Sequence, residues 1–216
     1  MPRLLDLFCG AGGAAMGYHR AGFEIVGVDN KPQPNYPFTF IQADALVYAR
    51  GHGHQFDTIH ASPPCQRYSK LTRNRSYHPD LYAPTRELLL SSGIPWIIEN
   101  VIGAPYDYGF VLCGSMFDLV VRRHRNFETS WLHLMGLRCN HIAQGRPITI
   151  IGHGGGKESP HSKKGIRAEW PDYMGMAWAT PRECTQAIPP AYTEYIGHEL
   201  IKTLKEASQG QTLPEA

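Results

Sequence analysis

The chain has 216 residues, of which 42% are hydrophobic and 19% charged, and its formal net charge is +2. This length predicts one domain with a proper core, and the high apolar content with low net charge excludes a disordered chain. No run of about 18 apolar residues offers a membrane span, and no basic leader precedes the first apolar segment, so we expect an intracellular protein without a signal peptide. The five cysteines are widely spaced and form no C-x-x-C pair, which argues against a disulfide framework or a ribbon-type zinc site.

Short apolar segments alternate with helical segments along the first hundred residues. Strands are predicted at 3–8, 23–28, 40–41, 56–60 and 96–99, and helices at 14–20, 84–92 and 193–206. This alternation is typical of βαβ units, so we expect an α/β fold with a Rossmann-like, doubly wound, mostly parallel sheet. Ligands of such sheets bind beyond the carboxyl ends of the strands.

A glycine-rich turn follows the first predicted strand. Gly10-Ala11-Gly12-Gly13-Ala14-Ala15 fits G-x-G-x-x-A between a strand and a helix, where glycines let the backbone approach a ligand closely. Asp29, at the end of the second strand, can accept hydrogen bonds from ribose hydroxyls, and Asp44, after the third, from an adenine amino group. These residues predict a pocket for an adenosine-containing cofactor, either NAD or S-adenosylmethionine. The alternative is a plain tight turn with two surface acids.

A stiff corner, Ser62-Pro63-Pro64-Cys65-Gln66, follows the fourth predicted strand. The two prolines fix the direction of the thiol, and a thiolate is a strong nucleophile when its pKa is lowered or a neighbouring acid–base group activates it. Glu99, at the end of the next strand, is the candidate partner because adjacent strand ends share one cleft. The alternative is that Cys65 is a small buried hydrophobic residue.

Five segments carry a resemblance to a known family. They are Asp6-Leu7-Phe8-Cys9-Gly10-Ala11-Gly12-Gly13, Pro63-Pro64-Cys65-Gln66, Glu99-Asn100-Val101, Arg123-His124-Arg125 and Gln186-Ala187-Ile188-Pro189-Pro190. In this order they resemble signature motifs of the cytosine-C5 DNA methyltransferases, in a compact, phage-like or bacterial form. The family commonly has Gln where this chain has Val121 and Asn where it has Gln186.

The resemblance implies a class I S-adenosylmethionine-dependent methyltransferase. A covalent bond from Cys65 to C6 of a flipped cytosine would activate C5 for methylation, leaving S-adenosyl-L-homocysteine as product. The implied catalytic residues are Cys65, Glu99, Arg123 and Arg125. The implied cofactor-binding residues are Phe8, Gly10, Gly12, Gly13, Asp29, Asn30, Asp44, Pro63 and Gln186. The implied substrate-binding residues are Pro64, Gln66, Asn100, Val101, Arg67, Lys70 and Arg73.

The chain divides into a catalytic S-adenosylmethionine-binding domain, residues 1–126 and 174–216, and a small, loop-rich target-recognition region, residues 127–173. Between Arg122 and Glu169 there are nine basic and three acidic residues, a local charge of +6. Because phosphate contacts dominate DNA affinity, this basic segment suits a clamp for the backbone of the double-stranded DNA that the resemblance implies as partner. The alternative is a solvated basic surface with no partner. The basic residues that follow Cys65 are positioned to close over a flipped base.

Metal-binding residues are too few in the pattern to predict a metal. Cys139, His141 and His153 are near one another in the sequence, but a closed zinc site needs four ligands at recognisable spacing. Trp131 and Trp170, which bracket the recognition region, are predicted to be core residues.

Two other functions stay open. One is the same chemistry on tRNA, and the other is a non-catalytic nucleic-acid-binding module on the same fold. The presence of both Cys65 and Glu99 favours an enzyme, and a thiol oxidoreductase is disfavoured because no resolving cysteine lies nearby. A chain this compact resembles methylases of bacteria or infecting phages, acting as a monomer, with or without a cognate restriction enzyme.

Overall fold

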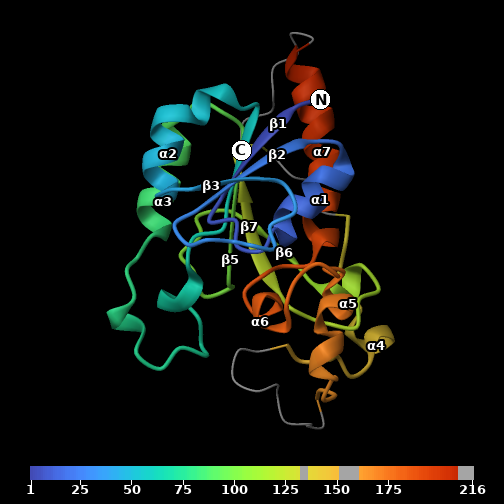
Figure 1. Ribbon diagram of the computed structural model, residues 1–216. Helices are drawn as coiled ribbons and strands as arrows, with labels where there is room; N and C mark the ends of the chain where they lie inside the picture. Colours follow the sequence, from blue (N-terminus) through green and yellow to red (C-terminus); the bar gives the residue numbers. More distant parts are fainter. Residues whose placement is uncertain (132–135, 151–160, 209–216) are drawn as a thin grey trace.

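A seven-stranded sheet with helices on both faces forms the centre of the computed structural model, which describes residues 1–131, 136–150 and 161–208 (Figure 1). The strands are β1 (Arg3–Leu7), β2 (Glu24–Asp29), β3 (Thr39–Gln42), β4 (Thr58–Ala61), β5 (Trp96–Asn100), β6 (Phe110–Leu112) and β7 (Arg125–Thr129). Their order in the sheet is β3-β2-β1-β4-β5-β7-β6. The first five run parallel, and β7 is antiparallel to both β5 and β6. The predicted α/β, doubly wound, mostly parallel fold is confirmed.

β1 and β4 run parallel, but the order in which the chain adds strands to the sheet changes direction between them. From β1 the strands proceed outward to β2 and β3, and the chain then returns to place β4 on the other side of β1. Crossovers on either side of this point diverge, so a crevice opens at the carboxyl ends of these two strands. The glycine-rich turn follows β1 and the Pro-Pro-Cys corner follows β4, so the sequence delivers both motifs to this crevice.

Helices cover the two faces of the sheet in separate pairs. On one face lie α1 (Gly13–Ala21) and α7 (Pro190–Ser208), and on the other lie α2 (Ala45–His52) and α3 (Tyr82–Ser91) (Figure 1). The alternation along β1 divides its apolar residues between the faces, because Leu4 packs on the α1–α7 side and Leu5 on the α2–α3 side. Gly17 lets α7 approach α1 closely, since a Cβ there would collide with the carbonyl oxygen of Pro190.

A third cluster of buried residues lies beyond the edge of the sheet, around α5 (Trp170–Met174) and α6 (Pro181–Cys184). Trp170 is 2% exposed in this cluster and Trp131 is 4% exposed in the α1–α7 core, which confirms both as core residues. The short helix α4 (His141–Gln144) lies on the same side (Figure 1). None of the helices in the described part of the chain has the length and apolarity that a membrane span needs.

The predicted boundary between residues 126 and 127 falls inside β7. This strand pairs with β5 and β6 along its length, so residues 127–129 belong to the sheet. Glu128, counted in the charge of the recognition region, is 2% exposed and accepts hydrogen bonds from Arg86 and Tyr82. It therefore faces the interior. Residues 151–160, which include His153, Lys157 and the run of three glycines, lie outside the described residues.

Candidate active site

A cavity of about 420 Å³ lies at the carboxyl ends of the central strands. Its volume is within the roughly 300–1,000 Å³ of small-molecule sites. The structure brings many of the predicted site residues to its walls: Phe8, Gly10, Gly13, Asp29, Asn30, Pro63, Pro64, Cys65, Gln66, Glu99, Arg125 and Gln186. The glycine-rich turn and the Pro-Pro-Cys corner therefore face one space, although 55 positions separate Gly10 from Cys65.

The glycine-rich turn is fixed by the carboxylate of Asp29. Its Oδ2 accepts a hydrogen bond from the backbone N–H of Gly10 at 3.2 Å, and its Oδ1 accepts one from Lys31 at 3.0 Å. Phe8, which begins the turn, has a positive φ of 57°. At Gly13 a Cβ would collide with the carbonyl oxygen of Ile188, so the segment that carries Gln186 packs directly against the start of α1.

The walls at this end fit a polar ligand such as S-adenosylmethionine. Asp6 is 1% exposed and lines the cavity; Tyr36 donates a hydrogen bond to its Oδ2, while its Oδ1 has no partner among the described residues. Burial raises the pKa of Asp6 to about 8, opposed by the Tyr36 hydrogen bond. A Cβ at Gly10 would meet no atom within 4 Å, so this part of the backbone lies open to a ligand. A buried acceptor without a partner is costly, and a ligand that hydrogen-bonds to Asp6 would remove that cost.

Two of the predicted cofactor residues support the pocket from outside. Asp44 does not line the cavity; its Oδ1 accepts a hydrogen bond from the backbone N–H of Val47 at 2.9 Å and caps the N-terminus of α2. Gly12 is likewise absent from the walls, and its positive φ of 81° places it at the N-cap of α1. Both residues therefore serve helix ends and do not face the cavity.

The corner that carries Cys65 is held to the neighbouring strand. Cys65 begins a short 3₁₀ helix, Cys65–Arg67, and the side chain of Asn100 at the end of β5 donates a hydrogen bond to the carbonyl oxygen of Pro63 at 2.8 Å. Asn100 and Val101 therefore position the corner and do not line the cavity. The ends of the neighbouring strands β4 and β5 therefore fix the position of the Cys65 thiol.

The Cys65 thiol keeps its proton in the free protein. Burial raises the pKa of Cys65, with Glu99 adding to the effect, while the positive charges of Arg125 and Arg123 oppose it. The sequence suggested activation by a lowered pKa or by a neighbouring acid–base group. The direction of the shift does not favour the first route.

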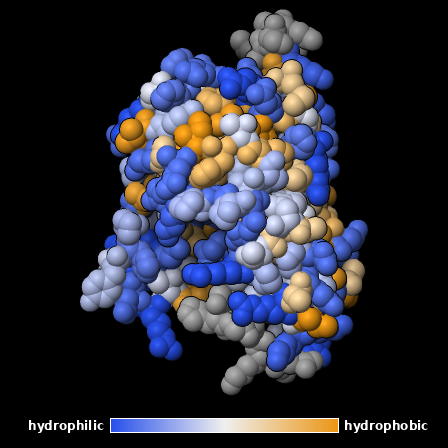
Figure 2. All heavy atoms as spheres, in the orientation of Figure 1, coloured by the Kyte–Doolittle hydropathy of each residue, from blue (hydrophilic) through white to orange (hydrophobic). Residues whose placement is uncertain are grey.

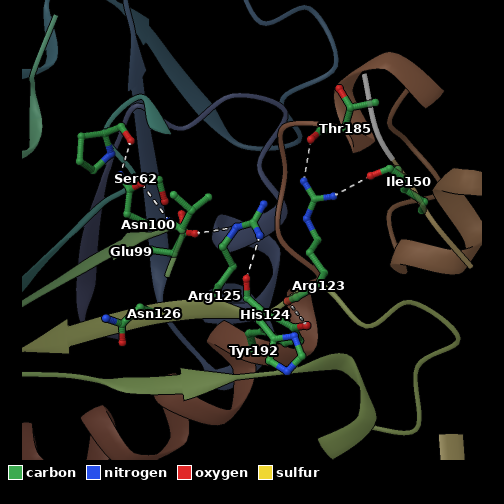
Figure 3. A network of polar contacts seen from close by, with 12 residues as sticks. Ser62, Glu99, Asn100, Arg123, His124, Arg125, Asn126, Ile150, Thr185 and Tyr192 are labelled. Atoms are coloured by element: carbon green, nitrogen blue, oxygen red, sulfur yellow. Dashed lines mark hydrogen bonds and ion pairs between the residues drawn. The ribbon is translucent and has the colours of Figure 1, made fainter. Parts of the chain in front are cut away.

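Glu99 and Arg125 form a buried ion pair in the wall of the cavity (Figure 3). Glu99 is 6% exposed, and its Oε1 lies 3.1 Å from Nε of Arg125 without a well-aligned hydrogen bond. Burial raises the pKa of Glu99, while Arg125 and a hydrogen bond with Ser62 lower it. Burial therefore favours the protonated form of the carboxyl group, and its Oε1 accepts no hydrogen bond among the described residues.

Arg123 has a different place from the one that the resemblance implies. Its guanidinium donates hydrogen bonds to the carbonyl oxygens of Thr185 at 2.7 Å and Ile150 at 3.4 Å, and it does not line the cavity (Figure 3). Its φ is +31°, and Tyr192 donates a hydrogen bond to its carbonyl oxygen at 2.8 Å. Burial lowers the pKa of Arg123 to about 9, reinforced by Arg125. Arg123 therefore braces the wall behind Arg125 and is not placed to touch a ligand in the cavity.

The basic residues after Cys65 lie on a loop that projects from the sheet, at the lower left of Figure 1, and its side chains in that view are mainly hydrophilic (Figure 2). Lys70 and Arg73 are exposed, Arg67 is half-buried, and none of the three lines the cavity. Sequence reasoning missed several polar wall residues, among them Asp6, Lys31, Gln33, Ser62, Arg182 and Glu183. A single acid inside an otherwise apolar strand was the available signal for Asp6.

Residues 2–80 match the family model of the C-5 cytosine-specific DNA methylases. This segment belongs to that family. The methylase segment contains the glycine-rich turn, Asp29 and Cys65, whereas Glu99 and Arg125 lie beyond it in the same cavity.

Three solved structures resemble this chain over 94% or 95% of its length. A DNA modification methyltransferase encoded within a prophage (E. coli) is 15% identical with a TM-score of 0.64, over 95% of this chain and 100% of that one. A Spodoptera frugiperda DNMT2 mutant is 14% identical with a TM-score of 0.61, over 95% and 100%. The S. pombe Dnmt2 methyltransferase is 13% identical with a TM-score of 0.62, over 94% and 99%. These likenesses show the fold, and no curated protein sequence matches the chain.

Proposed function

We propose that this chain is a DNA cytosine-C5 methyltransferase in which Cys65 is the nucleophile and S-adenosylmethionine the methyl donor. The observation that carries the proposal is the single cavity shared by Cys65, the Glu99–Arg125 pair and the glycine-rich turn. S-adenosylmethionine supplies an electrophilic methyl group on a sulfonium centre. The orphaned Oδ1 of Asp6 and the Asp29-fixed turn are the groups that would hold it.

Glu99 would recognise and activate the cytosine ring. Its open Oε1 can accept a hydrogen bond from the exocyclic amine, and the proton that its raised pKa favours can pass to N3. Arg125 keeps the carboxyl group in place and supplies positive charge beside the developing thiolate. A base buried in a duplex cannot reach this wall, so the target cytosine has to leave the stack, at a cost of a few kcal/mol.

The electron flow follows from these positions. The Cys65 thiol would first lose its proton to solvent, and its sulfur would then form a bond to C6. The C5=C6 electron pair moves to give a C4=C5 enamine, the C4=N3 pair moves to N3, and N3 takes the proton from Glu99. A bound S-adenosylmethionine would supply the methyl group that C5 takes up, with S-adenosyl-L-homocysteine as the leaving group. Loss of the C5 proton to a base restores C5=C6, breaks the bond from C6 to the sulfur of Cys65, and returns the N3 proton to Glu99.

DNA recognition falls to the basic segments beside the cavity. The loop with Arg67, Lys70 and Arg73 lies next to the nucleophile in the chain, and the recognition region of residues 127–173 adds further basic groups. Such groups contact phosphates without reading sequence, so they support a DNA partner and a short target site. We propose that one copy of the chain acts on DNA, because all of the groups named above come from a single chain.

The decisive experiment traps the covalent intermediate. A duplex with 5-fluorocytosine has no C5 proton to lose, so the wild-type protein with S-adenosylmethionine should form a stable adduct on Cys65, located by peptide mass spectrometry. Cys65→Ser should bind the same duplex without an adduct, and Cys184→Ala, which changes a buried cysteine outside the cavity, should form the adduct normally. A Cys65→Ser protein that methylates at the wild-type rate would refute the assignment of Cys65 as the nucleophile.

A parallel assay identifies which nucleic acid the protein methylates. The protein is incubated with methyl-labelled S-adenosylmethionine and either duplex DNA or tRNA, and the label is mapped by nucleoside analysis. The proposal expects 5-methylcytosine in the DNA. Label in tRNA alone would assign the same chemistry to RNA, and binding of duplex with label in neither would leave a non-catalytic binding module.

A further inference from the structure

Four potential metal ligands converge next to the catalytic wall, although they are far apart in the sequence. They are Cys113, His124, Cys139 and His141, and their ligand atoms all lie within 4.8 Å of one another. Cys113 directly follows β6, His124 directly precedes β7, and Cys139 and His141 lie at the start of α4. The sequence pattern showed only the last two, so the predicted absence of a metal did not take this arrangement into account.

Two sulfur–nitrogen distances within the cluster match the edge of a tetrahedral metal site. Sγ of Cys113 lies 3.5 Å from Nε2 of His141, and Sγ of Cys139 lies 3.5 Å from Nε2 of His124. Zinc bonds of about 2.3 Å to sulfur and about 2.0–2.1 Å to nitrogen predict a sulfur–nitrogen edge of about 3.6 Å in a tetrahedron. The two imidazole rings are 5.1 Å apart and nearly perpendicular, at 87°, so both can direct a nitrogen to a common centre.

We propose that these four side chains form a structural Zn²⁺ site. Two sulfur and two nitrogen ligands in tetrahedral geometry favour zinc over magnesium or calcium, which prefer oxygen. Four protein ligands complete the coordination and leave no position for substrate, so the site is structural and not catalytic. Binding replaces the two thiol protons by the metal and releases them to solvent.

The ion would join the recognition region to the catalytic sheet. The segment that carries Cys139 already docks there through Asn140, whose backbone N–H donates a hydrogen bond to Ser115, and through Gln144, which accepts one from Arg122. These contacts are at the surface or partly buried, so each adds little by itself. A zinc ion would lock the same junction through ligands on both sides of it.

His124 connects the proposed metal site to the wall of the cavity. His124 separates Arg123 from Arg125, and its own carbonyl oxygen accepts a hydrogen bond from Arg125 at 2.9 Å (Figure 3). A metal bond to the imidazole would therefore fix the backbone from which Arg125 reaches Glu99. This effect on catalysis rests on the proposed function, whereas binding of the metal does not.

The same four residues could also interact without a metal. The Cys113 thiol lies 3.1 Å from the carbonyl oxygen of Arg122 and can donate a hydrogen bond to it, and both sulfur–nitrogen distances suit N–H···S hydrogen bonds. A disulfide between Cys113 and Cys139 is the third arrangement. Each of these makes a different prediction for metal content and thiol reactivity.

The test measures metal in the full-length protein, purified under reducing conditions from cells supplied with zinc. We expect about one Zn²⁺ per chain by elemental analysis, and replacement by Co²⁺ should give the visible absorption of a tetrahedral, thiolate-bound ion. Cys139→Ser and His141→Asn should each lose most of the metal and the absorption. Matched controls are His198→Asn, at an exposed position on α7, and Cys184→Ala, and both should keep them.

A readout on wild-type protein covers the case in which the variants fail to fold. Removal of zinc with a chelator should make two cysteines newly reactive to a thiol reagent, and added Zn²⁺ should protect them again. Zinc well below one per chain, with no cobalt spectrum, would overturn the proposal. So would an intact mass lower by two hydrogens with a bond between Cys113 and Cys139, or full metal content in both ligand variants. None of these readouts depends on methyltransferase activity.

Discussion

Replacing Arg125 by Met tests whether the buried ion pair sets the state of Glu99. The substitution keeps a long apolar stem and removes the only positive charge that the structure places within 4 Å of this carboxylate among the described residues. Glu99 would be left 6% exposed and without its partner. Because Arg125 is the largest influence that lowers the pKa of Glu99, its loss should raise that pKa further.

The size of the effect depends on pH. Removing one partner of a buried pair costs about 3–5 kcal/mol when the remaining group stays charged, and each pKa unit is worth about 1.4 kcal/mol. The folded pKa of Glu99 already lies above its unfolded value, so the folded state holds a proton that the unfolded chain releases. Its ionisation therefore costs stability that grows as pH rises from the unfolded pKa to the folded pKa. Arg125→Met should accordingly be mild near pH 5 and most destabilising near pH 8.

A double-mutant cycle measures this directly. Free energies of unfolding are taken from urea titrations at both pH values for wild type, Arg125→Met, Glu99→Gln and the double variant. In the Glu99→Gln background the pH-dependent part of the Arg125→Met effect should vanish, leaving a coupling energy above about 1 kcal/mol at pH 8. Equal destabilisation at both pH values, with additive single effects, would refute the assignment of a raised Glu99 pKa to burial opposed by Arg125.

Two further predictions concern the cofactor end of the cavity. Burial holds the pKa of Asp6 at about 8, so the stability of the free protein should fall between about pH 4 and pH 8, and Asp6→Asn should flatten this profile in thermal melts. A steeper profile in the variant would contradict it. Gly13→Ala should destabilise the protein by about 1–3 kcal/mol and weaken S-adenosylmethionine binding in calorimetry, because its Cβ collides with Ile188. The control Gly51→Ala, in α2 with no atom near its Cβ, should leave binding unchanged.

The sequence predicted all five parallel strands from short runs that contain apolar residues and end at a turn. β1, β2, β4 and β5 lie inside the sheet between the helices and are buried along most of their length, whereas β3 lies at the edge and is partly exposed. β6 has only three residues and β7, with the sequence Arg-Asn-Phe-Glu-Thr, has one apolar residue. Both were missed because backbone pairing defines them: β7 pairs with β5 and β6, and β6 pairs with β7 at the edge of the sheet. A hydrophobic pattern cannot show such pairing.

The site was predictable where a local segment fixes its own geometry. The glycine-rich turn and the Pro-Pro-Cys corner carry their shape in their own residues, and both line the cavity as expected. Asp44 and Arg123 were misplaced for the opposite reason, because their side chains are used by partners from other segments: Asp44 caps α2, and Arg123 bonds to Thr185 and Ile150. Residue type at a strand end indicates a possible ligand contact, but competing backbone groups decide whether the side chain is free to make it.

The cluster of Cys113, His124, Cys139 and His141 extends this reasoning to metal sites. A spacing rule detects ligands only when one short segment supplies pairs of them, as in a zinc finger. Here β6 and β7 each supply one ligand beside their shared edge, and α4 supplies two from the opposite side of the junction. Pairing of β6 with β7, and not short spacing in the sequence, thus brings these ligands together. The apolar cluster around α5 already holds the segments after β7, and a metal ion at the junction would add four side-chain ligands to those contacts.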